Sequence, residues 1–437
     1  MSRLQIPIHS SKLRNGLRVV IAPDATAPVI TVGIYYKIGF RLEPQGRSGF
    51  AHLFEHMMFQ GSENAPKMQH IKLINSSGGV LNGSTMYDVT NYYQAVPSNA
   101  IERVLWLEAD RMKALKVDDE NLCNQRDVVK EEVRVNVLNQ PYGGFPWLDM
   151  PPVAFRNWAN AHNFYGDFAD LDAANLADVQ KFFKTYYVPN NAVLLMLGDI
   201  NVEEGVALAT KYFADIPAGT APPFADPTEP PQKEERRGHL EEKFGTLPAM
   251  AIGYVMPQRR TSEWCAMALL DQALHGGRVG RIYRNLVLEK QMAVEADGGI
   301  DDIFGYNGPT QMTTRILHKP EYSSEETLKA FDEVIREVRE NGITEDELQQ
   351  IKVKWRSDYY STLEGGRGGY MPRYGLMHLL ACFTLFDDAP QLVNTILDGF
   401  LAVTKQEVHA AAKEYLRLEN RAIVFRKPVK ADTKEAA

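Results

Sequence analysis

The chain has 437 residues, of which 44% are hydrophobic and 24% are charged, and its net charge is −8. This length exceeds what a single hydrophobic core usually serves, so we expect two domains of an ordinary globular protein. The acidic balance argues against a nucleic-acid partner, which normally meets a basic face. No apolar run approaches the length of a membrane-spanning helix, so we expect no membrane span.

The start of the chain and its cysteines bear on the compartment. Residues 1–20 lack the basic, apolar and small-residue layout of a secretory signal. Cys123, Cys265 and Cys382 lie far apart and form neither a disulfide framework nor a CxxC metal clip. We therefore expect a cytoplasmic setting, or a periplasmic one if a signal has been removed.

The first half of the chain alternates strand and helix patterns. "LRVVIAPD" (17–24) and "VITVGIYYKIG" (29–39) are typical of strands, whereas 117–138 has the pattern of a capped amphipathic helix. A further amphipathic helix over 176–187 leads into a β-branched strand that ends near residue 200. The proline-rich stretch 216–238 then reads as an extended linker, because such a density of proline sustains neither a helix nor a central strand.

The second half repeats this order. "HLEEKF" (239–244) and "AMAIGYVM" (249–256) are strand-like, 343–363 matches 117–138 at an offset of 226, and 403–427 matches the helix and strand that end the first half. The last match has a constant offset of 229, which pairs Val179 with Val408 and Tyr186 with Tyr415. Such self-similarity indicates a duplicated domain.

The predicted fold class is therefore α+β, with two homologous domains. Each is expected to be a mainly antiparallel sheet with helices packed on one face. The boundaries follow the linker: 1–215, then 216–238, then 239–437.

The stretch "GFAHLFEHMMFQG" (49–61) carries the strongest chemical signal. On a helix, His52 and His56 lie one turn apart on one face, where two imidazoles can bind the same Zn²⁺. Glu55 projects from nearly the same face, the HxxEH arrangement, and can serve as a base without being a ligand. The alternative is a set of polar residues on a buried helix, but burying three titratable groups without a metal or a polar network is costly.

A catalytic zinc site needs a third protein ligand, and "QRDVVKEEVRVN" (125–136) offers two adjacent glutamates. Neighbouring residues point about 100° apart on a helix, so only one of them can face the metal. Val128 and Val135 place Glu132 on or beside their apolar face, whereas Glu131 falls on the charged side. This favours Glu132, although spacing alone cannot identify a distant third ligand.

With "HLFEHMMFQG" followed by "QRDVVKEE", the sequence resembles the insulinase/pitrilysin family of inverzincin zinc peptidases, in particular its processing-peptidase branch. The resemblance covers essentially the whole chain. It implies a processing-peptidase-like metallohydrolase fold, one Zn²⁺ per chain held by His52, His56 and Glu132, and Glu55 as the general base for the attacking water. Gln125 stands where some members carry a second acidic residue that supports the site.

The same resemblance assigns a peptide-binding strand within "GGVLNGSTMYDVTNYYQAVP" (78–97). Asn82, Gly83, Ser84 and Thr85 would meet an extended peptide substrate by β-augmentation. The alternative is an ordinary sheet strand. The function implied is a zinc endopeptidase that hydrolyses peptide bonds in unfolded or extended peptides.

The second half departs from this pattern. At an offset of 216, Ala268, Asp271 and Gln272 replace the HxxEH residues. Family members that act alone also carry an arginine and a tyrosine in this domain, and the matching positions here are Val287 and Val294. The resemblance therefore implies a heterodimer with a homologous subunit that supplies the arginine–tyrosine pair, or alternatively a homodimer. A non-catalytic or latent scaffold subunit of the same fold is the competing hypothesis, and a purely structural zinc site is disfavoured because it gives Glu55 no role.

Overall fold

The computed structural model describes residues 4–223, 225–365 and 371–429, and its elements divide into two compact units. Unit 1 comprises Met1–Lys130, Phe164–Asp226 and Arg356–Leu397; unit 2 comprises Glu131–Asn163, Pro227–Trp355 and Asp398–Ala437. Each unit thus contains a segment from the other half of the sequence. The predicted domain boundaries at 215 and 239 separate the two sequence repeats, whereas the two units are defined by contacts. These boundaries therefore stay a prediction.

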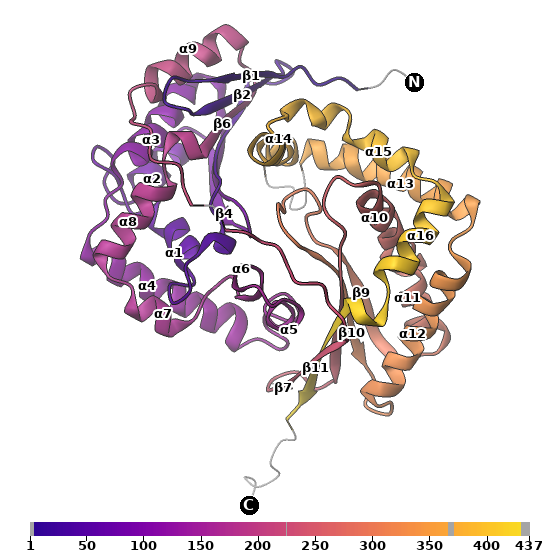
Figure 1. Ribbon diagram of the computed structural model, residues 1–437. Helices are drawn as coiled ribbons and strands as arrows, with labels where there is room; N and C mark the ends of the chain where they lie inside the picture. The colour runs from indigo at the N-terminus through magenta and orange to yellow at the C-terminus, as the bar shows by residue number, and fades with distance from the viewer. Residues whose placement is uncertain (1–3, 224, 366–370, 430–437) are drawn as a thin grey trace, which may run out of the picture. The chain divides into compact units, whose positions relative to one another are not determined.

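Unit 1 is built on a mixed sheet with the strand order β1-β2-β6-β3-β5-β4 among the described residues (Figure 1). Only the β2–β6 pairing is parallel in this part of the chain. The strands are β1 His9–Lys12, β2 Arg18–Pro23, β3 Val29–Tyr36, β4 Val80–Thr85, β5 Thr90–Pro97 and β6 Ala192–Gly198.

The helices associated with this unit are α1 Phe50–Met57, α2 Gln69–Ser76, α3 Ile101–Ala114, α4 Asp119–Val133, α7 Phe168–Ala173, α8 Leu176–Tyr186, α9 Val202–Phe213 and α14 Tyr374–Asp387, of which α4 continues into unit 2. On one face of the sheet, Ile30, Val32 and Ile34 of β3 are fully buried in a core that also contains Leu53 of α1 and Val104 of α3. The apolar faces of these helices therefore close one side of the sheet.

The opposite face of the same sheet is covered by α14, which lies more than 300 residues further along the chain (Figure 1). A Cβ placed on Gly33 of β3 would lie 2.5 Å from Sδ of Met377, so α14 approaches as closely as a glycine allows. Thr31 donates from Oγ1 to the carbonyl of Pro372 (2.8 Å), and the ring of Tyr35 lies 5.8 Å from that of His378.

Unit 2 repeats this plan with the order β7-β11-β8-β10-β9 among the described residues. The strands are β7 Arg236–Glu242, β8 Ala249–Val255, β9 Ala293–Ile300, β10 Gln311–His318 and β11 Arg421–Pro428, and β7–β11 is again the parallel pair. The helices are α5 Met150–Ala154, α6 Trp158–Ala161, α10 Ser262–His275, α11 Arg281–Tyr283, α12 Ser324–Asn341, α13 Glu345–Glu364, α15 Ile396–Ala402 and α16 Lys405–Tyr415, of which α13 and α15 continue into unit 1. Met150 and Ala154 of α5 pack against Ala251 and Val424 of the sheet, which gives this sheet too a helix from the other half of the sequence.

The predicted α+β fold with two sheets is confirmed, and the expected strands 17–24, 29–39 and 249–256 correspond to β2, β3 and β8. The expectation of helices on one face is incomplete, because both faces are covered. The physical reason is visible in β3 and β6, where nearly every residue is buried rather than every second one. A strand that is apolar on both faces needs cover on both faces.

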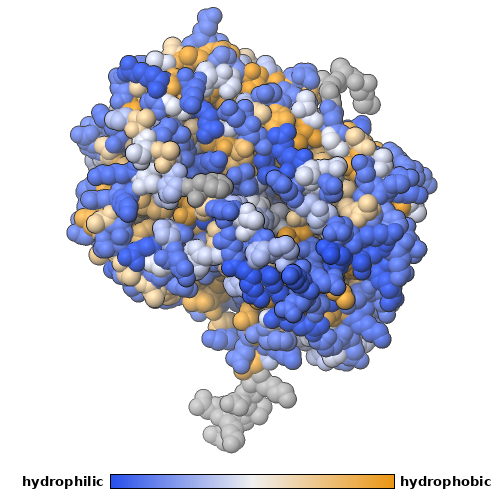
Figure 2. Space-filling model, viewed as in Figure 1, coloured by the Kyte–Doolittle hydropathy of each residue, from blue (hydrophilic) through white to orange (hydrophobic). Residues whose placement is uncertain are grey.

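The outer surface is predominantly hydrophilic in the view of Figure 2, with apolar residues scattered among polar ones. Within the described ranges, no helix combines the length and the apolar composition that crossing a membrane requires. The cytoplasmic setting stays a prediction.

A buried polar network joins Gln94 of β5 to Glu108 and Arg111 of α3 in unit 1. Glu108, which is fully buried, accepts hydrogen bonds from Nε2 of Gln94 (2.8 Å) and Nε of Arg111 (2.9 Å for the other carboxylate oxygen). His70 lies beside it, with Nε2 3.3 Å from Oε1 of Gln94. Burial, followed by the positive charge of Arg111, lowers the pKa of His70 to about 3.

This shift predicts an acid-sensitive fold. The unfolded chain binds a proton at His70 below about pH 6.5, whereas the folded chain does not until about pH 3, so the stability that is complete above pH 6.5 is lost as the pH falls. At pH 4.5 the loss is about 2–3 kcal/mol of unfolding free energy. We expect His70→Gln to flatten this dependence in urea titrations with chelator present, and the exposed-site control His239→Gln to retain it. An unchanged slope in His70→Gln would contradict this assignment.

Candidate metal centre

Helix α1 presents the HxxEH residues. It begins after Gly49, whose φ of +83° lies in the left-handed region, and its apolar side chains Phe50, Leu53 and Met57 are buried. Close approach fixes the entry to this helix: a Cβ on Gly166 would lie 2.3 Å from the backbone nitrogen of Gly49. The burial of one side of the helix leaves His56 and Glu55, which are partly exposed, on the other.

The two histidines lie one turn apart on the same face of α1, as their spacing predicts, and their rings meet edge to face. Their ring centroids lie 4.9 Å apart with planes at 83°, and His52 is 3% exposed. The rings of Phe164 and Tyr165 lie 4.7 Å and 5.1 Å from His52. These aromatic walls hold the imidazole in place.

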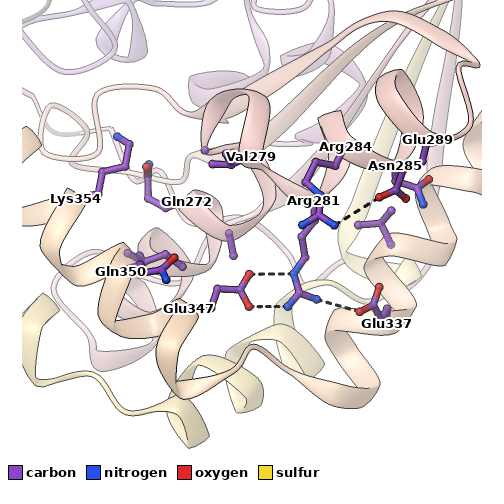
Figure 3. Close-up of a pocket in the computed structure, with 14 residues that line it drawn as sticks. Gln272, Val279, Arg281, Arg284, Asn285, Glu289, Glu337, Glu347, Gln350 and Lys354 are labelled. Carbon is purple, nitrogen blue, oxygen red and sulfur yellow. Dashed lines mark hydrogen bonds and ion pairs between the residues drawn. The ribbon is translucent and has the colours of Figure 1, made fainter.

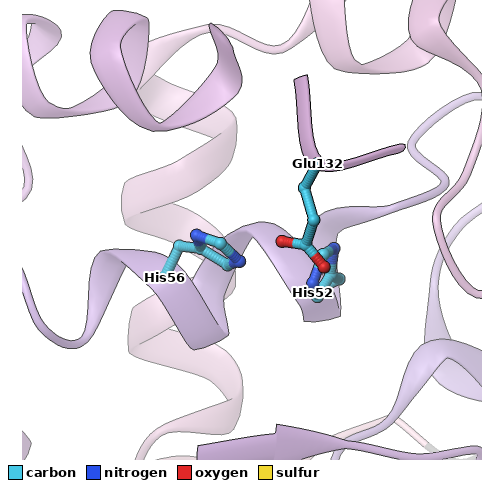
Figure 4. A group of neighbouring side chains, drawn as sticks. All are labelled: His52, His56 and Glu132. Carbon is cyan, nitrogen blue, oxygen red and sulfur yellow. The ribbon is translucent and has the colours of Figure 1, made fainter. Parts of the chain in front are cut away.

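Glu132 reaches the two histidines from the last turn of α4, immediately before a π-helical segment, Arg134–Leu138 (Figure 4). One potential ligand atom from each of His52, His56 and Glu132 lies within 4.8 Å of the others. Atoms that bind one ion at about 2.1 Å lie at most about 4.2 Å apart, so small side-chain rotations bring these three donors onto Zn²⁺. Two nitrogen donors and a carboxylate are a donor set that suits this ion.

The structure therefore brings together the three predicted ligands, but the predicted apolar face beside Glu132 is wrong. Val128 and Val135 do not mark a buried face, because they are 41% and 47% exposed. Glu131 is correctly placed on the solvent side, where its carboxylate pairs with Arg134 at 3.2 Å.

Glu55 lies on the same helix as the histidines, one residue before His56. Its charge acts on strand β5: burial, the neighbouring Tyr374 and Glu55 together raise the pKa of Tyr93 above its usual value. Tyr93 in turn pairs in register with Asn82 of β4. The carboxylate is thus close enough to affect the strands that neighbour α1.

Asn82, Gly83, Ser84 and Thr85 all lie on β4, the last strand of its sheet in the part of the chain that the structure describes. Thr85 contacts α1 directly, since its Oγ1 donates to the carbonyl of Ala51 (3.4 Å). The predicted peptide strand is therefore an edge strand beside the HxxEH helix. Its binding of substrate stays a prediction.

Gln125, the proposed supporting residue, is buried and donates from Nε2 to Oδ1 of Asn124 (2.8 Å). Its support of the metal ligands stays a prediction. A residue that local patterns did not reveal is Glu43, whose buried carboxylate meets the first turn of α1. The sequence contains no periodic signal for it, because it lies in a loop before the helix.

The second repeat carries different chemistry at the equivalent helix, α10. Ala268 is buried, and buried Asp271 lies 2.8 Å from Nδ1 of His275, whose Nε2 lies 2.8 Å from Oγ1 of Thr314. Across residues 4–223, 225–365 and 371–429, the group around His52 is the one set of metal-type side chains close enough to share an ion. These residues thus offer one candidate metal site, and the expected Zn²⁺ per chain stays a prediction.

Gln272, the counterpart of His56, lines a pocket of about 600 Å³ in unit 2 (Figure 3). Arg281 crosses this pocket and forms two hydrogen bonds with the carboxylate of Glu347, at 3.1 Å and 2.7 Å. Val287 lies in the neighbouring π-helical segment Arg284–Glu289, and Val294 is 47% exposed on β9. The two positions where the family resemblance predicts an arginine–tyrosine pair are therefore apolar here.

Comparison with known proteins agrees with the sequence resemblance. The family described as "Insulinase (Peptidase family M16)" matches residues 18–142, and the one described as "Peptidase M16 inactive domain" matches residues 173–354. The zinc protease PqqE of Helicobacter pylori is 28% identical over 97% of this chain and 94% of its own length. The β subunit of the mitochondrial-processing peptidase of Saccharomyces cerevisiae is 26% identical over 62% of this chain and 59% of its own length.

Solved structures show the same fold. The crystal structure of a protease from Helicobacter pylori superposes with a TM-score of 0.89 at 27% identity, covering 97% of this chain and all of that one.

A metal titration tests the centre. We expect purified protein to hold about one Zn²⁺ per chain, and His52→Ala to weaken binding by more than the about 100-fold that loss of a supporting residue can cost. Gln272→Ala, which alters the second repeat's counterpart of the other histidine, His56, is the control and should bind as the wild type does. Equal zinc content in His52→Ala and wild type, measured by atomic absorption after dialysis, would contradict the assignment.

Proposed function

Because the chain belongs to the peptidase M16 (insulinase) family, we propose that it is the zinc-bearing catalytic subunit of an endopeptidase. Its substrates are unfolded or extended peptides. The observation that carries this proposal is the convergence of His52, His56 and Glu132, with Glu55 on the same helix and the edge strand β4 alongside.

The roles follow from position and chemistry. A bound Zn²⁺ would act as a Lewis acid and make water more acidic. Glu55 lies next to a predicted ligand and is partly exposed, so its carboxylate is suited to take a proton from the attacking water and deliver it to the leaving amine.

Strand β4 supports the preference for extended peptides. An edge strand offers backbone groups to an incoming chain, and main-chain pairing needs the substrate to be extended. A folded protein does not present such a segment. The side chains of Asn82 to Thr85 would then lie along the bound peptide.

The assembly proposed is a heterodimer with a homologous subunit that carries the arginine–tyrosine pair. The side chains of Val287 and Val294 can neither donate to a developing oxyanion nor bind a peptide carbonyl, so we expect the side-chain donors to come from a partner subunit. A homodimer of this chain would leave positions 287 and 294 apolar in both subunits. The competing function is that of a latent scaffold subunit. An intact donor set with Glu55 beside it favours catalysis over the scaffold.

Substitution of the base is the direct test of catalysis. We expect Glu55→Gln to lower kcat by about 10²- to 10⁴-fold, the usual contribution of a general base, while zinc content stays unchanged. Glu63→Gln, at a nearby exposed glutamate, is the control and should retain activity. Hydrolysis of quenched fluorescent peptides provides the measurement, and equal rates for Glu55→Gln and wild type would exclude the proposed role.

The assembly is tested by activity with and without a partner. We expect the lone zinc-loaded chain to hydrolyse peptides slowly and a mixture with a homologous subunit that has the arginine–tyrosine pair to be faster. Full activity of the lone chain, with sedimentation showing no partner, would reject the obligate heterodimer and leave the peptidase proposal intact.

A further inference from the structure

Residues 39–43, here called the bracing segment, connect two parts of unit 1 that catalysis would need at a fixed separation. We propose that this segment positions the metal-binding helix α1 against the β4–β5 hairpin. In this role Glu43 fixes the position of the metal ligands on α1. Arg41, through its ion pair with Asp88, fixes the position of the peptide-binding strand. This inference rests on the proposed function for the meaning of the two sites, but its contacts are independent of it.

Glu43 holds the start of α1. Its side chain is 3% exposed, and its two oxygens accept hydrogen bonds from the backbone N–H groups of Gly49 (2.8 Å) and Ala51 (2.6 Å). The helix lacks a side-chain cap of its own, because its N-cap residue is Gly49. A carboxylate at this end accepts hydrogen bonds from backbone N–H groups that have no partner within the helix. Its negative charge also interacts favourably with the positive end of the helix dipole.

Oε1 of Glu43 accepts its hydrogen bond from the backbone N–H group of Ala51, the residue immediately before His52. A shift of Ala51 therefore shifts the first metal ligand, and His56 one turn later shifts with it. An eight-residue helix has few internal hydrogen bonds with which to resist such a movement. Glu43 is thus a positioning residue for the donor set.

Arg41 holds the other side. It is 2% exposed, its Nε donates to Oδ1 of Asp88 (2.8 Å), and its guanidinium lies 4.8 Å from the ring centroid of Tyr87. Asp88 and Tyr87 belong to the turn between β4 and β5, residues 86–89. The buried ion pair therefore fixes the turn from which the peptide-binding strand extends.

Backbone contacts keep the bracing segment rigid. Phe40 and Arg41 donate their N–H groups to the carbonyls of Met86 (3.2 Å) and Tyr87 (3.0 Å). A Cβ on Gly39 would lie 2.2 Å from the carbonyl oxygen of Met86, so no larger residue fits there without a shift. Glu43 follows within a single short turn, since its N–H donates to the carbonyl of Phe40 (3.0 Å).

Two variants separate the two ends of the segment. We expect Glu43→Gln, which turns one acceptor into a donor facing an N–H group, to raise the zinc dissociation constant about tenfold and lower kcat with little change in KM. We expect Asp88→Asn to raise KM about tenfold with zinc affinity unchanged. Glu203→Gln, at an exposed glutamate in the first turn of α9, is the control for general effects on helix capping.

Zinc affinity is measured by competition with a fluorescent chelator, so this arm does not depend on catalysis. Glu43→Asp keeps the charge and serves if Glu43→Gln fails to fold. Its zinc dissociation constant should be higher than that of wild type, by less than the increase expected for Glu43→Gln. Folded Glu43 variants with wild-type zinc affinity would overturn the proposal. So would Glu43→Gln and Asp88→Asn variants that alter zinc affinity and KM alike. Wild type that binds zinc but cleaves no peptide would reject the proposed function, and the zinc arm would still decide the role of Glu43.

Discussion

An eight-residue helix cannot hold two candidate metal ligands in place by itself. Isolated helices of this length are unstable in water, so the direction of α1 is set by what surrounds it. The contacts that set its direction are the buried carboxylate of Glu43 at its first turn, apolar side chains on its inner side and aromatic rings against His52. The arrangement of the donor set depends on these contacts before it depends on any metal.

The two repeats show how one scaffold supports different chemistry. Both sheets end, in the described residues, on the equivalent strand, β4 or β9, and both place a helix beside that strand. In the first repeat the helix carries His52, Glu55 and His56. In the second, His275 lies between Asp271 and Thr314 and is within hydrogen-bond distance of both, and Gln272 faces a pocket that the Arg281–Glu347 ion pair lines. Side chains at a few positions, not the fold, distinguish a metal centre from a structural network.

Local patterns were sufficient for much of this account and insufficient for the rest. The placement of His52 and His56 on one face of α1 follows from helical periodicity, and β2, β3 and β8 follow from β-branched runs. Helical periodicity does not identify Glu132, because Val128 and Val135 are largely exposed, and the family resemblance is the stronger guide to this residue. No local pattern points to Glu43, because a loop brings it to α1. The cover that α14 gives to β3 spans more than 300 residues, a distance that no local pattern reports, although the uniformly apolar β3 and β6 indicated that both faces needed cover.

The metal centre rests on the proposal that His52, His56 and Glu132 share one Zn²⁺. Anomalous diffraction from crystals of the zinc-loaded protein, recorded on both sides of the zinc absorption edge, locates the ion. We expect one strong peak per chain among these three side chains, with ligand distances of about 2.0–2.2 Å. A peak bound by other residues, or zinc-loaded crystals with no peak at this position, would contradict it.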